Sequence, residues 1–149
     1  MKNLLFSVLL ALPLAGAALA QGIEGKPSTP GAEVYFVNLA DGDTVTSPFK
    51  VIFGLSGMGI APAGIDKEGT GHHHLLVDRP PMGEGEMGAG ELKQPILSDE
   101  NNRHFGAGQT ETVVELPGGT HTLQLVLGDY IHVPHTPPVM SGVITITVE

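Results

Sequence analysis

The sequence predicts an all-β protein, an immunoglobulin-like antiparallel β-sandwich of about seven strands after a signal peptide. Short β-type runs recur along the chain, separated by segments rich in Gly and Pro, which number 21 and 12. The last run, residues 142–148, alternates apolar and polar side chains, as a half-buried antiparallel strand does. No window shows a helical period with capping residues.

The first 20 residues are predicted to be a secretory signal peptide. Lys2 supplies a positive start, an apolar run follows over residues 4–14, and Ala18-Leu19-Ala20 is a small-x-small cleavage site. The apolar run is too short to span a membrane. We therefore expect cleavage near Ala20, a periplasmic or secreted location, and no membrane span.

After the predicted cleavage site, residues 21–31 are expected to form a flexible lead-in, because Gly and Pro are frequent there. One β-sandwich domain is then expected over residues 32–149. Its predicted strands are residues 33–39, 49–55, 72–78, 110–116, 120–128 and 142–148. The connection after the third strand is long, and its part over residues 79–95 is expected to be a mobile loop.

The composition excludes several classes of function. The chain has 7 Lys and Arg against 16 Asp and Glu, and a formal net charge of −9. Nucleic acid is therefore not an expected partner, because neutralising phosphates requires clustered basic residues. The absence of Cys excludes disulfides, thiolate zinc sites and Cys nucleophiles. Seven His remain as the informative residues.

The third predicted strand begins with three consecutive histidines. Alternation along a strand places His72 and His74 on one face, and His73, Leu75 and Val77 on the other. Because Leu75 and Val77 are the better core pair, we expect His72 and His74 to point outward together. Their Cα atoms would lie about 6.5–7 Å apart, which lets both imidazoles reach one metal ion.

Three further histidines lie in predicted loops. His132 and His135 follow the fifth strand in the string GDYIHVPH, and His104 lies in the loop after the third strand. The start of one antiparallel strand lies beside the end of its neighbour, so His72, His74, His132 and His135 are expected to converge at one end of the sandwich. The loop that carries His104 is expected to place it over them. Imidazole without thiolate suits Cu(II), Zn(II), Ni(II) or Fe. The expected metal ligands are His72, His74, His132, His135 and His104.

A structural role is the alternative for these histidines. A histidine on a strand is often only hydrogen-bonded, and His121, in phase with the leucines of its strand, fits that description. A network of His and Asp side chains would stiffen the loops in that case. At a metal site, by contrast, Asp78, Asp129 and Glu100 are the candidate carboxylate ligands or residues that orient the histidines. The last two are also candidate bases for a metalloenzyme.

Three strings of the sequence resemble the domain-of-unknown-function 4399 family, a group of small secreted bacterial domains. They are GHHHLLVD (71–78), RHFGAGQTE (103–111) and LPGGTHTLQLVLGDYIHVPHTPPVMS (116–141). The stretch AEVYFVNLADGDTVTSPFKVIFGLSGMGIAPAG (32–64) is also similar. The resemblance covers about residues 31–149 and implies a secreted β-domain. It implies no particular activity, substrate or cofactor.

Function must therefore be argued from the residues. The leading hypothesis is a periplasmic or secreted His-rich protein that binds Cu or Zn for sequestration or delivery and is not an enzyme. The acidic surface would raise the local cation concentration. The alternative is a non-catalytic envelope module that binds a protein or glycan partner and has structural histidines. A metalloenzyme ranks last, because no motif indicates a substrate pocket.

Overall fold

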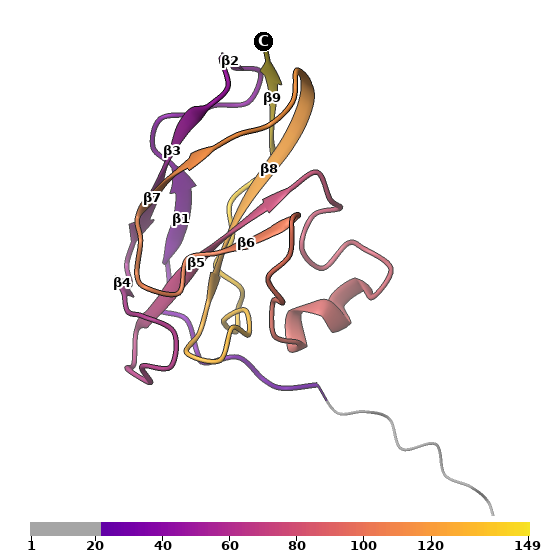
Figure 1. Ribbon diagram of the computed structural model, residues 1–149. Helices are drawn as coiled ribbons and strands as arrows, with labels where there is room; N and C mark the ends of the chain where they lie inside the picture. Colours follow the sequence, from indigo (N-terminus) through magenta and orange to yellow (C-terminus); the bar gives the residue numbers. More distant parts are fainter. Residues whose placement is uncertain (1–21) are drawn as a thin grey trace, which may run out of the picture.

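The computed structural model describes residues 22–149. The predicted signal peptide lies outside the described residues. Within them the chain forms nine strands and one short 3-10 helix, η1 (Figure 1). Their bounds are β1 Glu33–Phe36, β2 Thr44–Val45, β3 Phe49–Ser56, β4 Gly59–Ile60, β5 Thr70–Val77, η1 Gly88–Lys93, β6 Asn102–His104, β7 Glu111–Val114, β8 Gly119–Gly128 and β9 Ile144–Val148.

The strands form two sheets that pack against each other. One sheet has the order β1-β3-β7, and the other has the order β2-β9-β8-β5-β4, with β6 also paired to β5. The pairs are antiparallel except for the short contacts of β2 with β9 and of β4 with β5, which are parallel. This two-sheet arrangement confirms the prediction of an all-β sandwich.

All six strands that the sequence predicts are present, with shifted ends. The first predicted strand ends early, at Phe36, and the third begins earlier than expected, at Thr70. The additional strands β2, β4 and β6 have two or three residues each. Such short strands were not predicted, because alternation cannot be recognised over so few positions.

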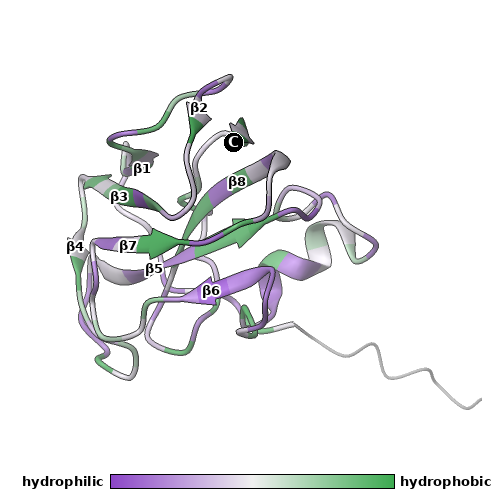
Figure 2. Ribbon diagram, turned by 45° about the horizontal axis from the view of Figure 1, so that its top comes forward, coloured by the Kyte–Doolittle hydropathy of each residue, from purple (hydrophilic) through white to green (hydrophobic). Residues whose placement is uncertain are grey.

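The main core lies between the two sheets. Val51 and Phe53 from β3 meet Leu75 from β5, Leu125 from β8 and Ile146 from β9, and all five are buried. Figure 2 shows hydrophobic stretches on β7 and β8, whereas β6 is hydrophilic. Each fully buried aliphatic side chain contributes about 1.5–3 kcal/mol to folding. Leu75 and Val77 face this core, as the alternation predicts.

Residues 79–95, for which we expected a mobile loop, contain η1 and part of a second apolar cluster. Met82 packs with Leu76, Ile96 and Val126 on the face of β5 and β8 that points away from the main core. The backbone amide of Met82 donates to the side-chain oxygen of Gln124 at 2.9 Å. Both faces of β5 are therefore covered.

The expectation that His72 and His74 point out of the domain is consequently wrong in one respect. They do face away from Leu75 and Val77, but both side chains are fully buried. The reason is that β6 pairs with β5 and the loop after β8 folds back over the same end of the sheet. Alternation predicts which face a side chain is on, but not whether that face meets solvent.

The expected lead-in lies against the end of η1 and against the loop that follows β8. Ile23 donates its amide to the carbonyl of Lys93 at 2.9 Å, and Pro27 forms a parallel bridge with Thr136. The amide of Lys26 donates to the Asp129 carboxylate at 3.1 Å. Among residues 22–149, no helix is long and apolar enough to cross a membrane.

Candidate metal centre

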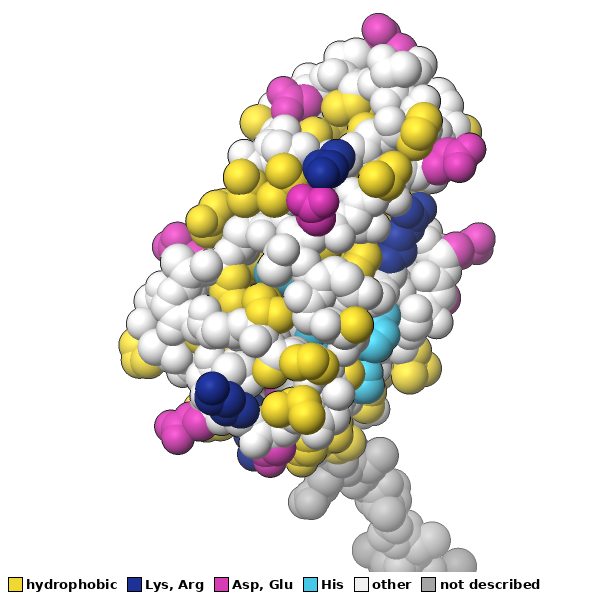
Figure 3. All heavy atoms as spheres, turned by 60° about the vertical axis from the view of Figure 1, so that its left-hand side comes forward, with side chains coloured by type: hydrophobic (Ala, Val, Ile, Leu, Met, Phe, Trp, Pro, Cys, Tyr) yellow, Lys and Arg dark blue, Asp and Glu magenta, His cyan; other side chains and the backbone are white. Residues whose placement is uncertain are grey.

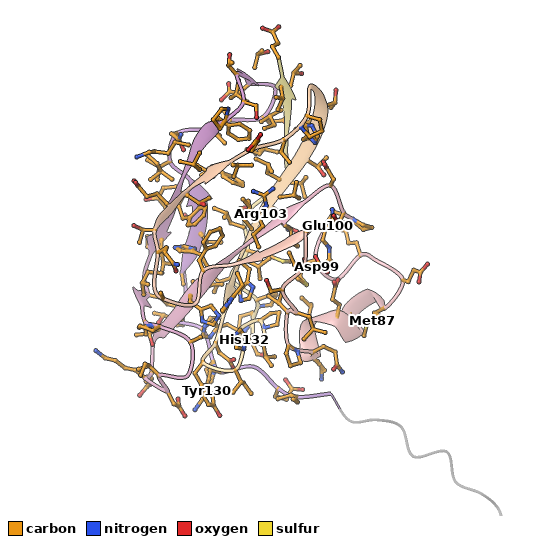
Figure 4. The ribbon with its side chains drawn as sticks, in the orientation of Figure 1. Met87, Asp99, Glu100, Arg103, Tyr130 and His132 are labelled. Atoms are coloured by element: carbon orange, nitrogen blue, oxygen red, sulfur yellow. The ribbon has the colours of Figure 1, made fainter. Side chains whose placement is uncertain are left out.

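Strand pairing and the loop after β8 bring four imidazoles together at one end of the larger sheet. In β5, His72 is opposite Gly128 of β8, and His74 is opposite His104 of β6. The loop after β8 adds His132, which Figure 4 places at the lower end of the sandwich. We call His72, His74, His104 and His132 the four-histidine cluster.

Three members of the cluster are placed to share one ion. The ligand atoms of His72, His74 and His104 all lie within 4.8 Å of one another. The Nε2 atoms of His72 and His74 are 3.1 Å apart. Two nitrogens bound to one metal at about 2.0–2.1 Å are separated by about 3 Å, so this spacing fits a shared ion.

His132 completes the cluster at its edge. Its ring centroid lies 4.7 Å from that of His104, 5.0 Å from that of His72 and 6.0 Å from that of His74. His104 and His132 are half-buried, whereas His72 and His74 are fully buried. Imidazole groups reach the surface over a small area of the face in Figure 3. An ion would therefore enter past His104 and His132.

The hydrogen bonding of the cluster does not resemble a structural network. The Nδ1 atoms of His72 and His74 and the Nε2 atom of His104 are buried and have no hydrogen-bond partner among the described residues. Of the two facing Nε2 atoms, only one can donate to the other. Each unpaired buried polar group costs about 1–3 kcal/mol. An ion bound between the Nε2 atoms would give His104 Nε2 a partner, while the Nδ1 atoms of His72 and His74 would stay unpaired.

The electrostatic environment keeps these imidazoles neutral. Burial, together with the neighbouring imidazoles, lowers the pKa of His72 to about 4 and that of His74 to about 2. The same causes lower the pKa of His104. Neutral imidazole has a free lone pair, which is the form that binds metal ions. At neutral pH these three side chains are ready to act as ligands.

Three glycines make room for the imidazole rings. A Cβ atom added at Gly128 would lie 2.8 Å from Nε2 of His74, and one at Gly106 would lie 2.5 Å from Nε2 of His104. A Cβ at Gly71 would lie 2.8 Å from Nε2 of His135. Sequence reasoning missed these residues, although Gly lies within four positions of a site histidine in GHHH, HFG and GDYIH.

His135, the fifth expected ligand, lies beside the cluster rather than in the group that could share an ion. Its ring is buried, and its Nδ1 atom donates to the carbonyl of Lys26 at 3.0 Å. The Nε2 atom has no hydrogen-bond partner among residues 22–149. Burial lowers the pKa of His135, which leaves Nε2 as a free acceptor close to His72.

The remaining two histidines lie elsewhere. His121 lies in the first half of β8, where Nδ1 contacts the Asp78 carboxylate at 2.7 Å and Nε2 contacts the Pro117 carbonyl at 2.9 Å. This is the structural role that the sequence suggested for it. His73 faces the main core, with its ring centroid 5.0 Å from that of Phe53.

The three carboxylates proposed from the sequence do not hydrogen-bond the cluster. Asp78 contacts His121, and Asp129 accepts the amides of Ile131 and Val133, both at 3.0 Å. Asp129 thereby shapes the turn that carries His132, whose φ of 73° is unusual for a residue other than Gly. Glu100 lies in the loop before β6, away from His132 (Figure 4).

A family model described as "Domain of unknown function (DUF4399)" matches residues 51–149. The chain belongs to this family. The match includes the four-histidine cluster and all three glycines, and it confirms the resemblance that the histidine strings indicated. No curated protein and no solved structure matches the chain.

Proposed function

We propose that this member of the DUF4399 family is a periplasmic or secreted protein that binds a transition metal, Cu or Zn, for sequestration or delivery. One observation carries the proposal. The ligand atoms of three imidazoles from two paired strands lie within 4.8 Å of one another, and one nitrogen of each ring has no hydrogen-bond partner among the described residues. A shared ion would bind the Nε2 atoms of His72 and His74, which face each other at 3.1 Å, in place of the single hydrogen bond that they can form.

The lowered pKa values also support metal binding. Protons compete with metal ions for imidazole, so a cluster that stays neutral well below pH 6.5 binds metal over a wider pH range than exposed histidines do. The net charge of −9 favours the approach of cations.

The arrangement favours binding over catalysis. A hydrolytic metal site needs a base or a second polar group next to the open ligand position. Among the described residues, Asp78 contacts His121 and Asp129 accepts backbone amides, while Glu100 lies away from His132 (Figure 4). A carrier or storage role requires only the ligands and a path to solvent.

Calorimetric titration of metal-stripped residues 21–149 with Cu(II) and with Zn(II) tests the proposal. The test variant is His72→Ala/His74→Ala, and the matched control is His121→Gln, which removes a histidine outside the cluster. We expect saturable binding, micromolar or tighter, by the native chain and by the control, and none by the test variant. Equal affinity in all three proteins would refute the proposal.

The test variant empties two fully buried positions, so its folding must be checked by circular dichroism. Should it unfold, His104→Gln/His132→Gln replaces the two half-buried members instead and conserves polarity. Weaker metal binding by this folded variant supports the cluster as the site, and unchanged binding refutes it.

One observation favours the alternative, an envelope interaction module. The outer face of the β1-β3-β7 sheet exposes Tyr35, Val37 and Val113, with exposed fractions of 46%, 55% and 62%. Exposed aromatic and aliphatic groups are frequent where proteins meet partners. This module would become the better hypothesis if neither ion showed saturable binding.

A further inference from the structure

We propose that the four-histidine cluster holds its ion tetrahedrally and that its preferred cargo is Cu(I). This inference rests on the proposed function and specifies the metal. Three features carry it: the spacing of the rings, the packing that restrains them, and the charge of the ligands.

Ring spacing distinguishes a tetrahedron from a square plane. With metal–nitrogen bonds of about 2.0–2.1 Å, a ring centroid lies about 3.2 Å from the ion. A tetrahedron then separates all six pairs of centroids by about 5.2 Å, whereas a square plane gives four separations of about 4.5 Å and two of about 6.4 Å.

The observed separations follow the tetrahedral pattern. Five pairs lie between 4.7 and 5.1 Å, and only the pair of His74 and His132 is longer, at 6.0 Å. The ligand atoms that already lie within 4.8 Å of one another are those of His72, His74 and His104. The half-buried ring of His132 must therefore turn toward them to supply the fourth nitrogen. A square plane needs a second long pair, and there is none. Square-planar or tetragonal ligand sets are typical of Cu(II) and Ni(II). The filled d shells of Zn(II) and Cu(I) impose no such geometry.

Packing restrains the rings against flattening into a plane. The backbone of Gly128 lies against the ring of His74, and that of Gly106 lies against the ring of His104. His72 and His74 also project from the same strand, two positions apart, and both are fully buried. Dense packing makes a rearrangement of these rings costly.

The ligands carry no charge, which decides between the two tetrahedral ions. Four neutral imidazoles leave the full charge of the ion in a largely buried site, and no carboxylate among the described residues hydrogen-bonds them. The cost of transferring an ion from water rises with the square of its charge, so a divalent ion costs about four times as much as Cu(I). Divalent ions are also attracted more strongly to imidazole. Where the desolvation cost exceeds that stronger attraction, Cu(I) is favoured over Zn(II) and Cu(II).

Affinity measurements by competition test this inference. Cu(I) is titrated without oxygen against the chromogenic chelator bicinchoninate, and Cu(II) and Zn(II) are titrated against chelators of known affinity at the same pH. We expect the native chain to bind Cu(I) at least tenfold more tightly than Cu(II) or Zn(II). A Cu(II)-loaded sample should also give the electron paramagnetic resonance spectrum of a distorted tetrahedral site.

A matched pair of variants tests the role of charge. His132→Glu adds one negative ligand at the half-buried edge, and His132→Gln removes the imidazole without adding charge. We expect His132→Glu to lower the ratio of Cu(I) affinity to Zn(II) affinity at least tenfold below that of His132→Gln. An equal ratio in the two variants would overturn the charge argument.

The outcomes separate this inference from the proposed function. Tighter binding of Zn(II), or of Cu(II) with a square-planar spectrum, overturns the preference for Cu(I) and leaves the metal-binding function in place. Failure of all three ions to bind overturns both. The comparison between ions uses the native chain, so it does not depend on the folding of any variant.

Discussion

Replacing Gly128 by Ala should remove His74 from the metal site. The new Cβ would lie 2.8 Å from Nε2 of His74 and 3.1 Å from its Cδ2. Ordinary contacts between such atoms are about 3.5 Å or longer, so the ring must move by about 0.7 Å. Metal–ligand distances vary by only about 0.2 Å, and such a shift therefore breaks or weakens the bond.

The expected loss of metal affinity is about 10- to 100-fold, the usual effect of disturbing a residue that positions a ligand. Overpacking at this buried position should also lower the free energy of unfolding by about 1–3 kcal/mol. Titration with Zn(II) and with Cu(I), together with urea unfolding of the metal-free protein, measures both effects.

Gly142→Ala is the matched control for this substitution. A Cβ added at Gly142 meets no atom within 4 Å, and the backbone there is not in the left-handed region. We expect unchanged affinity and a change in stability within about 0.5 kcal/mol. A folded Gly128→Ala variant with the affinity of the control would show that His74 is not a ligand.

Three further predictions concern pH. Burial lowers the pKa of His73 from 6.5 to about 4. As pH drops from 6.5 toward 4, the imidazole of His73 is therefore protonated in the unfolded chain but not in the folded one, and the free energy of unfolding falls. Between pH 7 and pH 4, the free energy of unfolding measured in urea should therefore fall by about 3 kcal/mol less in His73→Phe than in the native chain. An equal fall in the two proteins would contradict this prediction. The Asp78 carboxylate raises the pKa of His121, so this pair stabilises the fold below pH 6.5, and the effect fades as pH rises through the raised value. His121→Gln should thus be more destabilising at pH 5.5 than at pH 9, and the opposite order would exclude a charged pair. Because the pKa values of His72 and His74 are about 4 and about 2, Zn(II) binding should remain saturable at pH 5.5, and its complete loss there would point to exposed histidines as ligands.

Much of the fold was predictable because its signals are local. A strand has a period of two residues, so the sequence HHHLLV already shows that His72 and His74 share a face opposite Leu75 and Val77. Gly and Pro mark the ends of strands, and six strands were located in this way. The approach of His132 to His72 was expected from the antiparallel order of neighbouring strands. His104 was expected in a loop and instead lies in β6, beside His74.

Other features depended on contacts that no local pattern records. The sequence did not predict that Met82 and its neighbours cover the outer face of β5, or that His72 and His74 are buried. The space left by Gly128 and Gly106 matters only once the strands are paired. His135 was expected among the ligands, yet its Nδ1 is held by the carbonyl of Lys26, which is far away in the sequence.

The sequence by itself determined the class of fold, the face of each strand that builds the core, and the histidines that are candidate ligands. Those properties follow from side-chain alternation and turn preferences, which act over a few residues. Only the tertiary structure decided which imidazoles meet, how deeply they are buried and in what geometry. Those properties depend on how long connections fold back over the sheet, and many weak contacts between distant residues determine that path.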